Sequence, residues 1–245
     1  MIKVMKHLFW IMICLLPLAS LTFVLAADSE QEKIAEILSK VKSEYEAVKT
    51  LKTEFQQESF QSILQETRLE NGWLAIQKPE KMVWKYKEPT QKTALLDGTY
   101  VWLYNAADHH LYREKYDQFA QNMFYQLISG NIVLDKEFQV SFWKGEQKDN
   151  QKVKEQLKLV PITTHRTISH IVVTIAEASF FISQTTVYDH YGNKTTCSFS
   201  NYSINPQLED DVFRLTIPEK VIFTDFTGHK LETAELKNSP TLKLE

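Results

Sequence analysis

Asp108, His109 and His110 are consecutive and form the strongest candidate for chemistry in this sequence. Carboxylate and imidazole groups together bind divalent metals and activate water, as a metal-dependent hydrolase requires. The triplet stands at the start of an expected strand, where successive side chains point to opposite faces, so the three groups cannot all face one ion. A polar hairpin turn after Tyr104 is the better interpretation, and a hydrolase remains only as an alternative.

Other catalytic signals are absent from the sequence. It has no Gly-x-Ser-x-Gly elbow, no phosphate-binding glycine loop and no His-Glu-x-x-His motif, and its six glycines are too few for a dinucleotide site. His165, His170 and His190 are scattered over expected turns and strand starts. We therefore predict no enzyme, no metal site and no cofactor.

The composition is that of an ordinary globular protein. Of the 245 residues, 43% are hydrophobic and 24% are charged, which argues against global disorder. The sequence pI of about 6.2 argues against a nucleic-acid partner, because domains that bind nucleic acid usually have a basic excess.

Residues 1–26 are typical of a cleavable signal peptide. Lys3 and Lys6 precede a long apolar run, and Val24–Ala26 suits a signal peptidase. An uncleaved membrane anchor is the alternative, because the run is almost long enough to span a bilayer. Loss of both lysines would change the formal net charge from −3 to −5. Cys14 would leave with the signal, so Cys197 would remain without a partner for an internal disulfide.

Two segments predict amphipathic helices. Over 29–51, apolar residues recur at three- and four-residue steps, with Lys and Glu on the other faces. The stripe consists of Ile34, Leu38, Val41, Tyr45 and Val48. Over 117–128, the apolar side consists of Phe119, Met123, Phe124, Leu127 and Ile128, and Gly130 is a suitable C-cap. Both helices need a hydrophobic partner.

The rest of the chain alternates in short runs rich in β-branched and aromatic residues, with turn signals such as Asp97-Gly98. We expect strands over 52–60, 66–78, 81–87, 91–97, 99–105, 109–115, 136–144, 153–160, 167–176, 180–188, 194–204 and 212–217. Connections of hairpin length favour one large antiparallel sheet, which must curl. The predicted fold class is mainly β (α+β), with the helices on the concave side. Residues 226–245 lose the pattern and are expected to be a tail.

The stretch 72–91 concentrates aromatic residues in one expected hairpin. Strand parity places Leu74, Ile76, Met82, Trp84 and Tyr86 on one face, with Lys78 as a single cation at its rim. Further along, Trp102 belongs to a second aromatic ladder with Tyr100 and Tyr104. Aromatic pairs also stabilise ordinary cores, so a plain core is an alternative to a pocket wall. A nucleic-acid stacking platform fits badly, because it would need interleaved basic charge.

The same stretch resembles the LolA family, the periplasmic carriers of outer-membrane lipoproteins. The resemblance rests on Gly72, Ile76, Pro79, Trp84, Tyr86, Pro89 and Gln91, followed by Leu96-Asp97-Gly98, Trp102 and Tyr104. Looser agreement is found in Phe55-Gln56-Gln57, Leu127-Ile128-Ser129-Gly130, Leu159-x-Pro161, Asp189-x-x-Gly192-Asn193 and Asp211-x-Phe213. The resemblance covers about 34–221.

The resemblance implies an incomplete antiparallel β-barrel with a helical lid, in one domain over 27–225. It implies a cavity for lipoprotein acyl chains, with walls at Leu74, Ile76, Met82, Trp84, Tyr86 and Trp102. The expected lid and latch residues are Leu38, Val41, Tyr45, Phe124, Leu127 and Lys78. Carriers of this kind are periplasmic monomers that make and break no covalent bond. They take a lipoprotein from an inner-membrane ABC lipoprotein-releasing transporter and pass it to an outer-membrane receptor lipoprotein.

Lys78 departs from the family pattern. The resemblance implies an arginine here that latches the barrel wall to carbonyl groups of the lid. Lysine keeps the charge but lacks the planar fork of donors, so the latch should be less specific or work differently. Met82 fits the place of a bulky apolar residue near the cavity mouth, and its flexibility suits variable acyl chains. The alternatives within the same fold are a lipid or glycolipid shuttle and a sensor of mislocalised lipoproteins.

Overall fold

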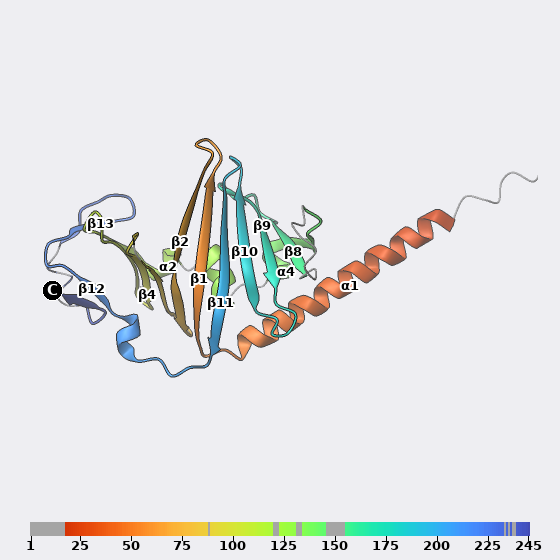
Figure 1. Cartoon of the computed structure of the whole chain (residues 1–245). Helices are drawn as coiled ribbons and strands as arrows, with labels where there is room; N and C mark the ends of the chain where they lie inside the picture. Colours follow the sequence, from red (N-terminus) through yellow and green to blue (C-terminus); the bar gives the residue numbers. More distant parts are fainter. Residues whose placement is uncertain are drawn as a thin grey trace, which may run out of the picture.

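One curled twelve-stranded sheet dominates the computed structural model, which describes residues 18–87, 89–119, 123–130, 134–145, 155–232, 234, 236 and 239–245 (Figure 1). The strand order is β13-β6-β5-β4-β3-β2-β1-β11-β10-β9-β8-β7. The two outermost strands are not paired with each other, so the sheet stays open. The predicted fold, an incomplete antiparallel barrel, is confirmed.

The strands agree with the predicted segments as far as residue 204. They are β1 (Thr50–Gln61), β2 (Glu66–Gln77), β3 (Lys81–Tyr86), β4 (Lys92–Asp97), β5 (Tyr100–Asn105), β6 (His110–Lys115), β7 (Phe138–Phe142), β8 (Gln156–Pro161), β9 (Ile168–Ile175), β10 (Ile182–Asp189) and β11 (Lys194–Ile204). Neighbours among them pair antiparallel, whereas the unpredicted β13 (Ile222–Asp225) pairs parallel with β6.

The long strand β1 joins the two halves of the sheet. It pairs along its length with β2 on one side and with β11 on the other, so that Phe55 lies opposite both Gly72 and Phe199. From Leu51 to Phe55, buried and exposed residues alternate, as expected for a strand with one face in a core.

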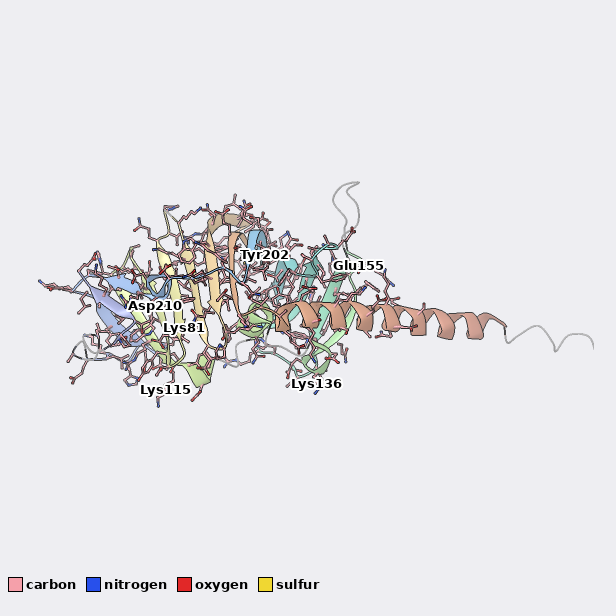
Figure 2. All side chains as sticks on the ribbon, turned by 90° about the horizontal axis from the view of Figure 1, so that it is seen from below. Lys81, Lys115, Lys136, Glu155, Tyr202 and Asp210 are labelled. Carbon is pink, nitrogen blue, oxygen red and sulfur yellow. The ribbon has the colours of Figure 1, made fainter. Side chains whose placement is uncertain are left out.

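Within the described residues, four helices accompany the sheet: α1 (Leu18–Glu46), α2 (Tyr116–Phe119), α3 (Met123–Ser129) and α4 (Leu134–Glu137). The first predicted helix ends at Glu46 and not at residue 51, because Leu51 already pairs with Ile76 in the sheet. The second predicted helix corresponds to α2 and α3, and residues 120–122 lie outside the described residues. Lys33 of α1 lies 2.7 Å from the carboxylate of Glu155, which precedes β8 and is labelled in Figure 2.

The N-terminal prediction is only partly within the described residues. Residues 1–17 lie outside them, and α1 runs through Ala26, after which cleavage was predicted. The signal peptide therefore stays a prediction. No helix in the described part of the chain is long and apolar enough to cross a membrane.

The part of the chain that the structure describes forms two hydrophobic cores, on opposite faces of the sheet. On the concave face, buried residues of α1, α3 and α4 contact the strands; this core includes Val41, Tyr45, Leu74, Trp84 and Leu127. On the other face, strand residues contact the C-terminal segment; this core includes Val83, Leu95, Trp102, Phe223 and Leu236.

The C-terminal segment is folded, so the prediction of a tail over 226–245 was wrong. A 3-10 turn (Asp210–Phe213) and β12 (Leu215–Ile217) replace the single strand predicted over 212–217. β14 (Leu242–Leu244) pairs in parallel with β12, and Leu236 is only 2% exposed in the second core. The apolar residues responsible are too few and too widely spaced to form a recognisable period.

Candidate functional site

The apolar wall predicted from strand parity is present on the concave face. Leu74, Ile76, Met82 and Trp84 are buried, and Tyr86 is half-buried. The hairpin register places Leu74 opposite Trp84 and Ile76 opposite Met82, so their side chains share one face. The structure therefore brings together every residue predicted for the wall except Trp102.

An aromatic cluster forms the centre of this wall. The Phe55 ring centroid lies 4.6 Å from that of Trp84 and 5.0 Å from that of Tyr86, the latter edge-on, and Trp84 meets Phe199 at 6.1 Å. Gly72 makes this approach possible. A Cβ atom there would lie 2.0 Å from the carbonyl oxygen of Lys85 and 2.9 Å from the Phe55 ring.

Trp102 lies on the opposite face, and its prediction as part of the wall was wrong. Leu96, which faces inward, pairs with Val101, so Trp102 points away from the concave side. It is 1% exposed, stacks on Phe223 at 6.3 Å and donates its indole N–H to Asp97 over 2.7 Å. The register of β5 against β4 determines which face of the sheet Trp102 occupies. The alternation of residues within β5 alone does not reveal this face.

The predicted lid residues lie on the concave side of the sheet, in the same core as the wall. Val41, Tyr45 and Leu127 are buried in the same core as Trp84, and Leu38 is partly buried against it. Phe124 belongs to α3, but its side chain lies outside the described residues. A cleft between the lid and β10 holds about 460 Å³ of space that is partly open to solvent. It is lined by Leu38, Val41, Lys42, Tyr45, Leu127, Gly130, Leu134, Asp135 and Ile182.

Lys78 connects the wall to the lid. Its ammonium group donates a hydrogen bond to the backbone carbonyl of Tyr45 over 2.6 Å, and its backbone N–H donates to the carbonyl of Lys49 over 2.9 Å. Burial lowers the pKa of Lys78, while the nearby Glu46 carboxylate opposes the shift. Tyr45 is itself fixed, because its ring meets Phe181 edge-on at 5.1 Å.

The family model of the outer membrane lipoprotein carrier protein LolA matches residues 46–216. The chain belongs to the LolA family. The match includes the wall, Lys78 and every strand from β1 to β11, and it leaves β13 and β14 outside.

Curated relatives of this LolA family member carry the same description. It is 26% identical to the outer-membrane lipoprotein carrier protein of Nitrosomonas europaea over 71% of this chain and 87% of the relative. It is also 26% identical to that of Cupriavidus pinatubonensis, over 70% and 79% of the two chains. A LolA superfamily protein of known structure from Nitrosomonas europaea gives a TM-score of 0.38 at 13% identity, covering 74% of this chain and 97% of that one.

The residues first considered for catalysis do not converge in this LolA family member. The Asp108 carboxylate accepts a hydrogen bond from Asn105, His109 occupies a turn with φ of 48°, and His110 contacts Thr224 at 2.9 Å. Among the described residues, no group of three His, Cys, Asp or Glu side chains could hold a metal ion. Cys197 is buried, and burial raises the pKa of its thiol to about 12, which makes it a poor nucleophile.

Sequence reasoning missed a group of polar residues beside the wall. Arg68 and Glu70 occupy the same face of β2 as Leu74, and Lys92 lies on the corresponding face of β4. The parity that identified Leu74 and Ile76 would have placed Glu70 and Arg68 on their face, had it been continued towards the start of β2.

Proposed function

We propose that this LolA family member is a periplasmic carrier that binds the acyl chains of lipoproteins released from the inner membrane and delivers them to an outer-membrane receptor. The observation that carries the proposal is an apolar, aromatic wall that shares one buried core with helix residues and is joined to α1 by Lys78. The family match and the description shared by the curated relatives support lipoprotein cargo. They do not favour the alternatives of a lipid or glycolipid shuttle and a lipoprotein sensor.

The physical need for such a carrier follows from the chemistry of the cargo. Exposure of each acyl CH₂ group to water costs about 0.8 kcal/mol, so a lipoprotein anchor with several chains would cost on the order of tens of kcal/mol. A wall made of Leu74, Met82 and Trp84 offers the chains an apolar surface in place of water. The flexible thioether of Met82 can adapt to chains of different shape.

Cargo binding requires movement of the lid. In the structure, the buried side chains of Val41, Tyr45 and Leu127 contact the core that includes the wall. Acyl chains that displace them exchange one apolar contact for another, so the open and closed states can differ by only a few kcal/mol. Such a balance allows both uptake and release without covalent chemistry.

The proposal also specifies the partners and the compartment. The carrier receives its cargo from an inner-membrane ABC lipoprotein-releasing transporter and passes it to an outer-membrane receptor lipoprotein. It acts in the periplasm as a monomer, reaches this compartment by means of the signal peptide over 1–26, and needs no cofactor.

Binding of a synthetic triacylated lipopeptide tests the proposal. We expect the purified chain to bind the lipopeptide and to ignore the same peptide without acyl chains. Trp84→Ala should weaken binding, whereas Trp73→Ala, on the outer face of the neighbouring strand, should not. Met82→Gln provides a milder change in the wall if Trp84→Ala fails to fold. Equal behaviour of the acylated and unacylated peptides would refute the carrier function.

Mass spectrometry of lipid extracts tests the alternative cargo. Material that co-purifies with the protein from a periplasm should contain acylated peptides. If extracts contain only free lipids or glycolipids, the lipid shuttle becomes the better explanation. The lipid-transfer and lipoprotein-transfer functions are thus separated by one measurement.

A further inference from the structure

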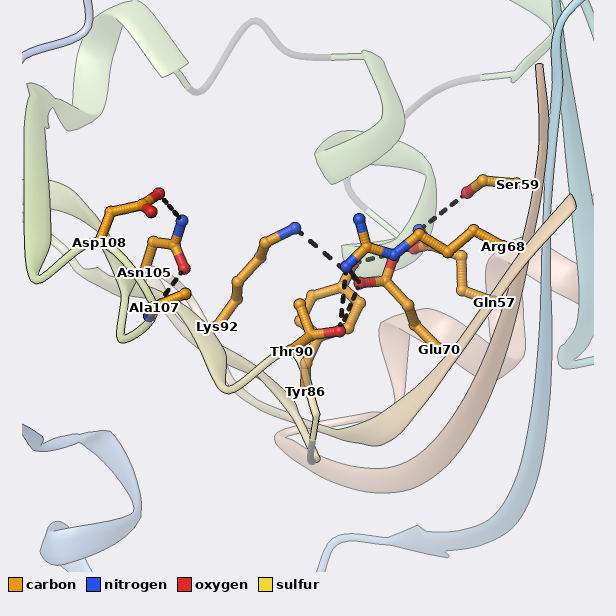
Figure 3. A network of polar contacts seen from close by, with 10 residues as sticks. All are labelled: Gln57, Ser59, Arg68, Glu70, Tyr86, Thr90, Lys92, Asn105, Ala107 and Asp108. Carbon is orange, nitrogen blue, oxygen red and sulfur yellow. Dashed lines mark hydrogen bonds and ion pairs between the residues drawn. The ribbon is translucent and has the colours of Figure 1, made fainter. Parts of the chain in front are cut away.

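The concave face changes from apolar to polar along its length. Beyond Leu74, the next residues of β2 on this face are Gly72, Glu70 and Arg68, and Lys92 is added from β4. Figure 3 shows the side chains of Arg68 and Lys92 extending from opposite sides towards Glu70. We call Gln57, Arg68, Glu70, Thr90 and Lys92 the polar cluster.

Glu70 is the centre of the polar cluster, and its side chain is only 8% exposed. One carboxylate oxygen accepts a hydrogen bond from the Thr90 hydroxyl over 2.8 Å and lies 3.3 Å from an Arg68 nitrogen and 3.8 Å from the Lys92 ammonium. The other accepts from the Gln57 amide over 3.3 Å. A covered carboxylate with these partners is well satisfied, and it holds two cations in place.

The two cations remain accessible. The side chain of Arg68 is 61% exposed and that of Lys92 is 34% exposed, whereas Glu70 lies beneath them. The three charged groups sum to one net positive charge. A guanidinium has five N–H donors and an ammonium has three, and Glu70 and Thr90 occupy only part of this capacity. The accessible part of the cluster therefore favours oxygen acceptors that carry full or partial negative charge.

Tyr86 connects the polar cluster to the apolar wall. Its hydroxyl donates a hydrogen bond to the Gln57 amide oxygen over 2.8 Å, while its ring meets Phe55 edge-on. Gln57 in turn donates to the Glu70 carboxylate. The acidic and basic groups of the cluster thus begin where the aromatic wall ends, on one continuous surface.

We propose that Arg68 and Lys92, held by Glu70, form a head-group subsite for the polar end of an acylated ligand. The subsite would bind negatively polarised oxygen atoms at the head of the acyl chains while the chains lie against the wall. The oxygen atoms are either the ester and amide carbonyls of an acylated peptide or the phosphate of a phospholipid. This inference rests on the proposed function, because it needs a ligand whose chains occupy the wall.

A triple variant, R68Q/E70Q/K92Q, tests the subsite. It removes all three charges, keeps polar side chains of similar length and lowers the net charge by one unit. Lys85→Gln is the matched control, because it changes the net charge equally from the exposed outer face of β3. The single variant K92Q, at a third-exposed side chain, serves if the triple variant is unstable. Thermal unfolding verifies that each variant is folded.

Three probes separate the possible outcomes: the triacylated lipopeptide, phosphatidylglycerol and an uncharged long-chain alcohol. We expect the triple variant to bind the lipopeptide, the phospholipid or both with about fivefold or more lower affinity. Its affinity for the alcohol should be unchanged. The probe that loses affinity identifies the source of the oxygen atoms.

Unchanged affinity for both head groups, together with weakened binding by Trp84→Ala, would overturn the subsite and leave the carrier function intact. Failure of the unaltered protein to bind any acylated probe would instead overturn both proposals. Equal losses of head-group affinity in the triple variant and in Lys85→Gln would show only a general effect of net charge. That result would also reject the subsite.

Discussion

The ammonium group of Lys78 is hydrogen-bonded to the backbone carbonyl of Tyr45 over 2.6 Å. This contact joins the end of β2 to the last turn of α1, where the Tyr45 carbonyl also accepts a hydrogen bond from the backbone N–H of Val48 over 3.2 Å. Carbonyl oxygens at a helix C-terminus carry partial negative charge. The cation is therefore a second donor to this carbonyl and complements the helix terminus. The lysine makes a contact of the kind that the family resemblance implied for an arginine at this position.

Replacement of Lys78 by Met should make the lid easier to open. The contact exists in the closed state, so its loss raises the free energy of that state relative to a state in which cargo occupies the wall. For a partly exposed charged hydrogen bond we expect about 1 kcal/mol, or about a fivefold increase in affinity for the triacylated lipopeptide. Transfer of the lipopeptide to acceptor vesicles should slow correspondingly.

Two further variants serve as controls for the latch. Lys78→Arg keeps the charge and adds donors, so it should leave affinity unchanged or lower it. Lys85→Met removes a cation from the outer face and should have no effect. If Lys78→Met changes neither affinity nor the rate of transfer, Lys78 is a solvated rim charge and the latch is discarded.

Gly72→Ala should destabilise the fold by about 2–3 kcal/mol, because overpacking at this site displaces backbone as well as a ring. The added Cβ would lie 2.0 Å from the Lys85 carbonyl oxygen and 2.9 Å from Phe55. Gly228→Ala has open space around it and should cost less, about 1 kcal/mol, from its positive φ alone. Urea unfolding of both variants provides the comparison, and equal losses would contradict the packing argument.

The sequence was sufficient to locate the sheet and its wall, because both depend on short-range alternation. Leu74, Met82 and Trp84 lie at alternate positions within one hairpin, and a single turn fixes their common face. Trp102 lies two further turns along the chain, and the pairing of Leu96 with Val101 places it on the face opposite to the one expected. The sequence predicts no register for β5 against β4, and a difference of one residue in that register decides which core receives the indole.

The polar cluster and the C-terminal segment depended on contacts between distant positions. Parity along β2 places Glu70 on the concave face, but its neighbours in the strand are mostly exposed. Its burial depends on contacts with Arg68, Thr90 and Lys92, which one strand alone does not reveal. The residues around Leu236 show no apolar periodicity in the sequence. Leu236 belongs to the second core because the C-terminal segment packs against the sheet.

His170 should make the fold less stable in mild acid. Its ring stacks on Tyr188 with centroids 4.4 Å apart, and burial, with a smaller contribution from Lys158, lowers its pKa below 6.5. A histidine with a depressed native pKa takes up its proton more readily in the unfolded chain. Its contribution to stability is therefore present above pH 6.5 and is lost as the pH falls towards the native pKa.

His170→Phe keeps an aromatic ring against Tyr188 and removes this titration. The difference in unfolding free energy between the unaltered protein and His170→Phe should be constant above pH 6.5 and should move in favour of the variant below it. His190→Gln, in an exposed turn, is the control. Parallel stability curves for the unaltered protein and His170→Phe from pH 7.5 to pH 5 would contradict the assignment.

Leu236→Ala should destabilise the protein by about 2–4 kcal/mol, as expected for a large buried aliphatic side chain. Leu236 is 2% exposed and lies in the core that also contains Trp102 and Phe223, although it belongs to a region outside the family match. Leu231→Ala, at a partly buried position in the same segment, should cost less. Chemical denaturation monitored by tryptophan fluorescence measures both losses, and a variant as stable as the unaltered protein would show that the C-terminal segment does not support the second core. Because Trp102 is fixed from that side, loss of the segment should loosen the outer face of β5 while the wall around Trp84 remains packed.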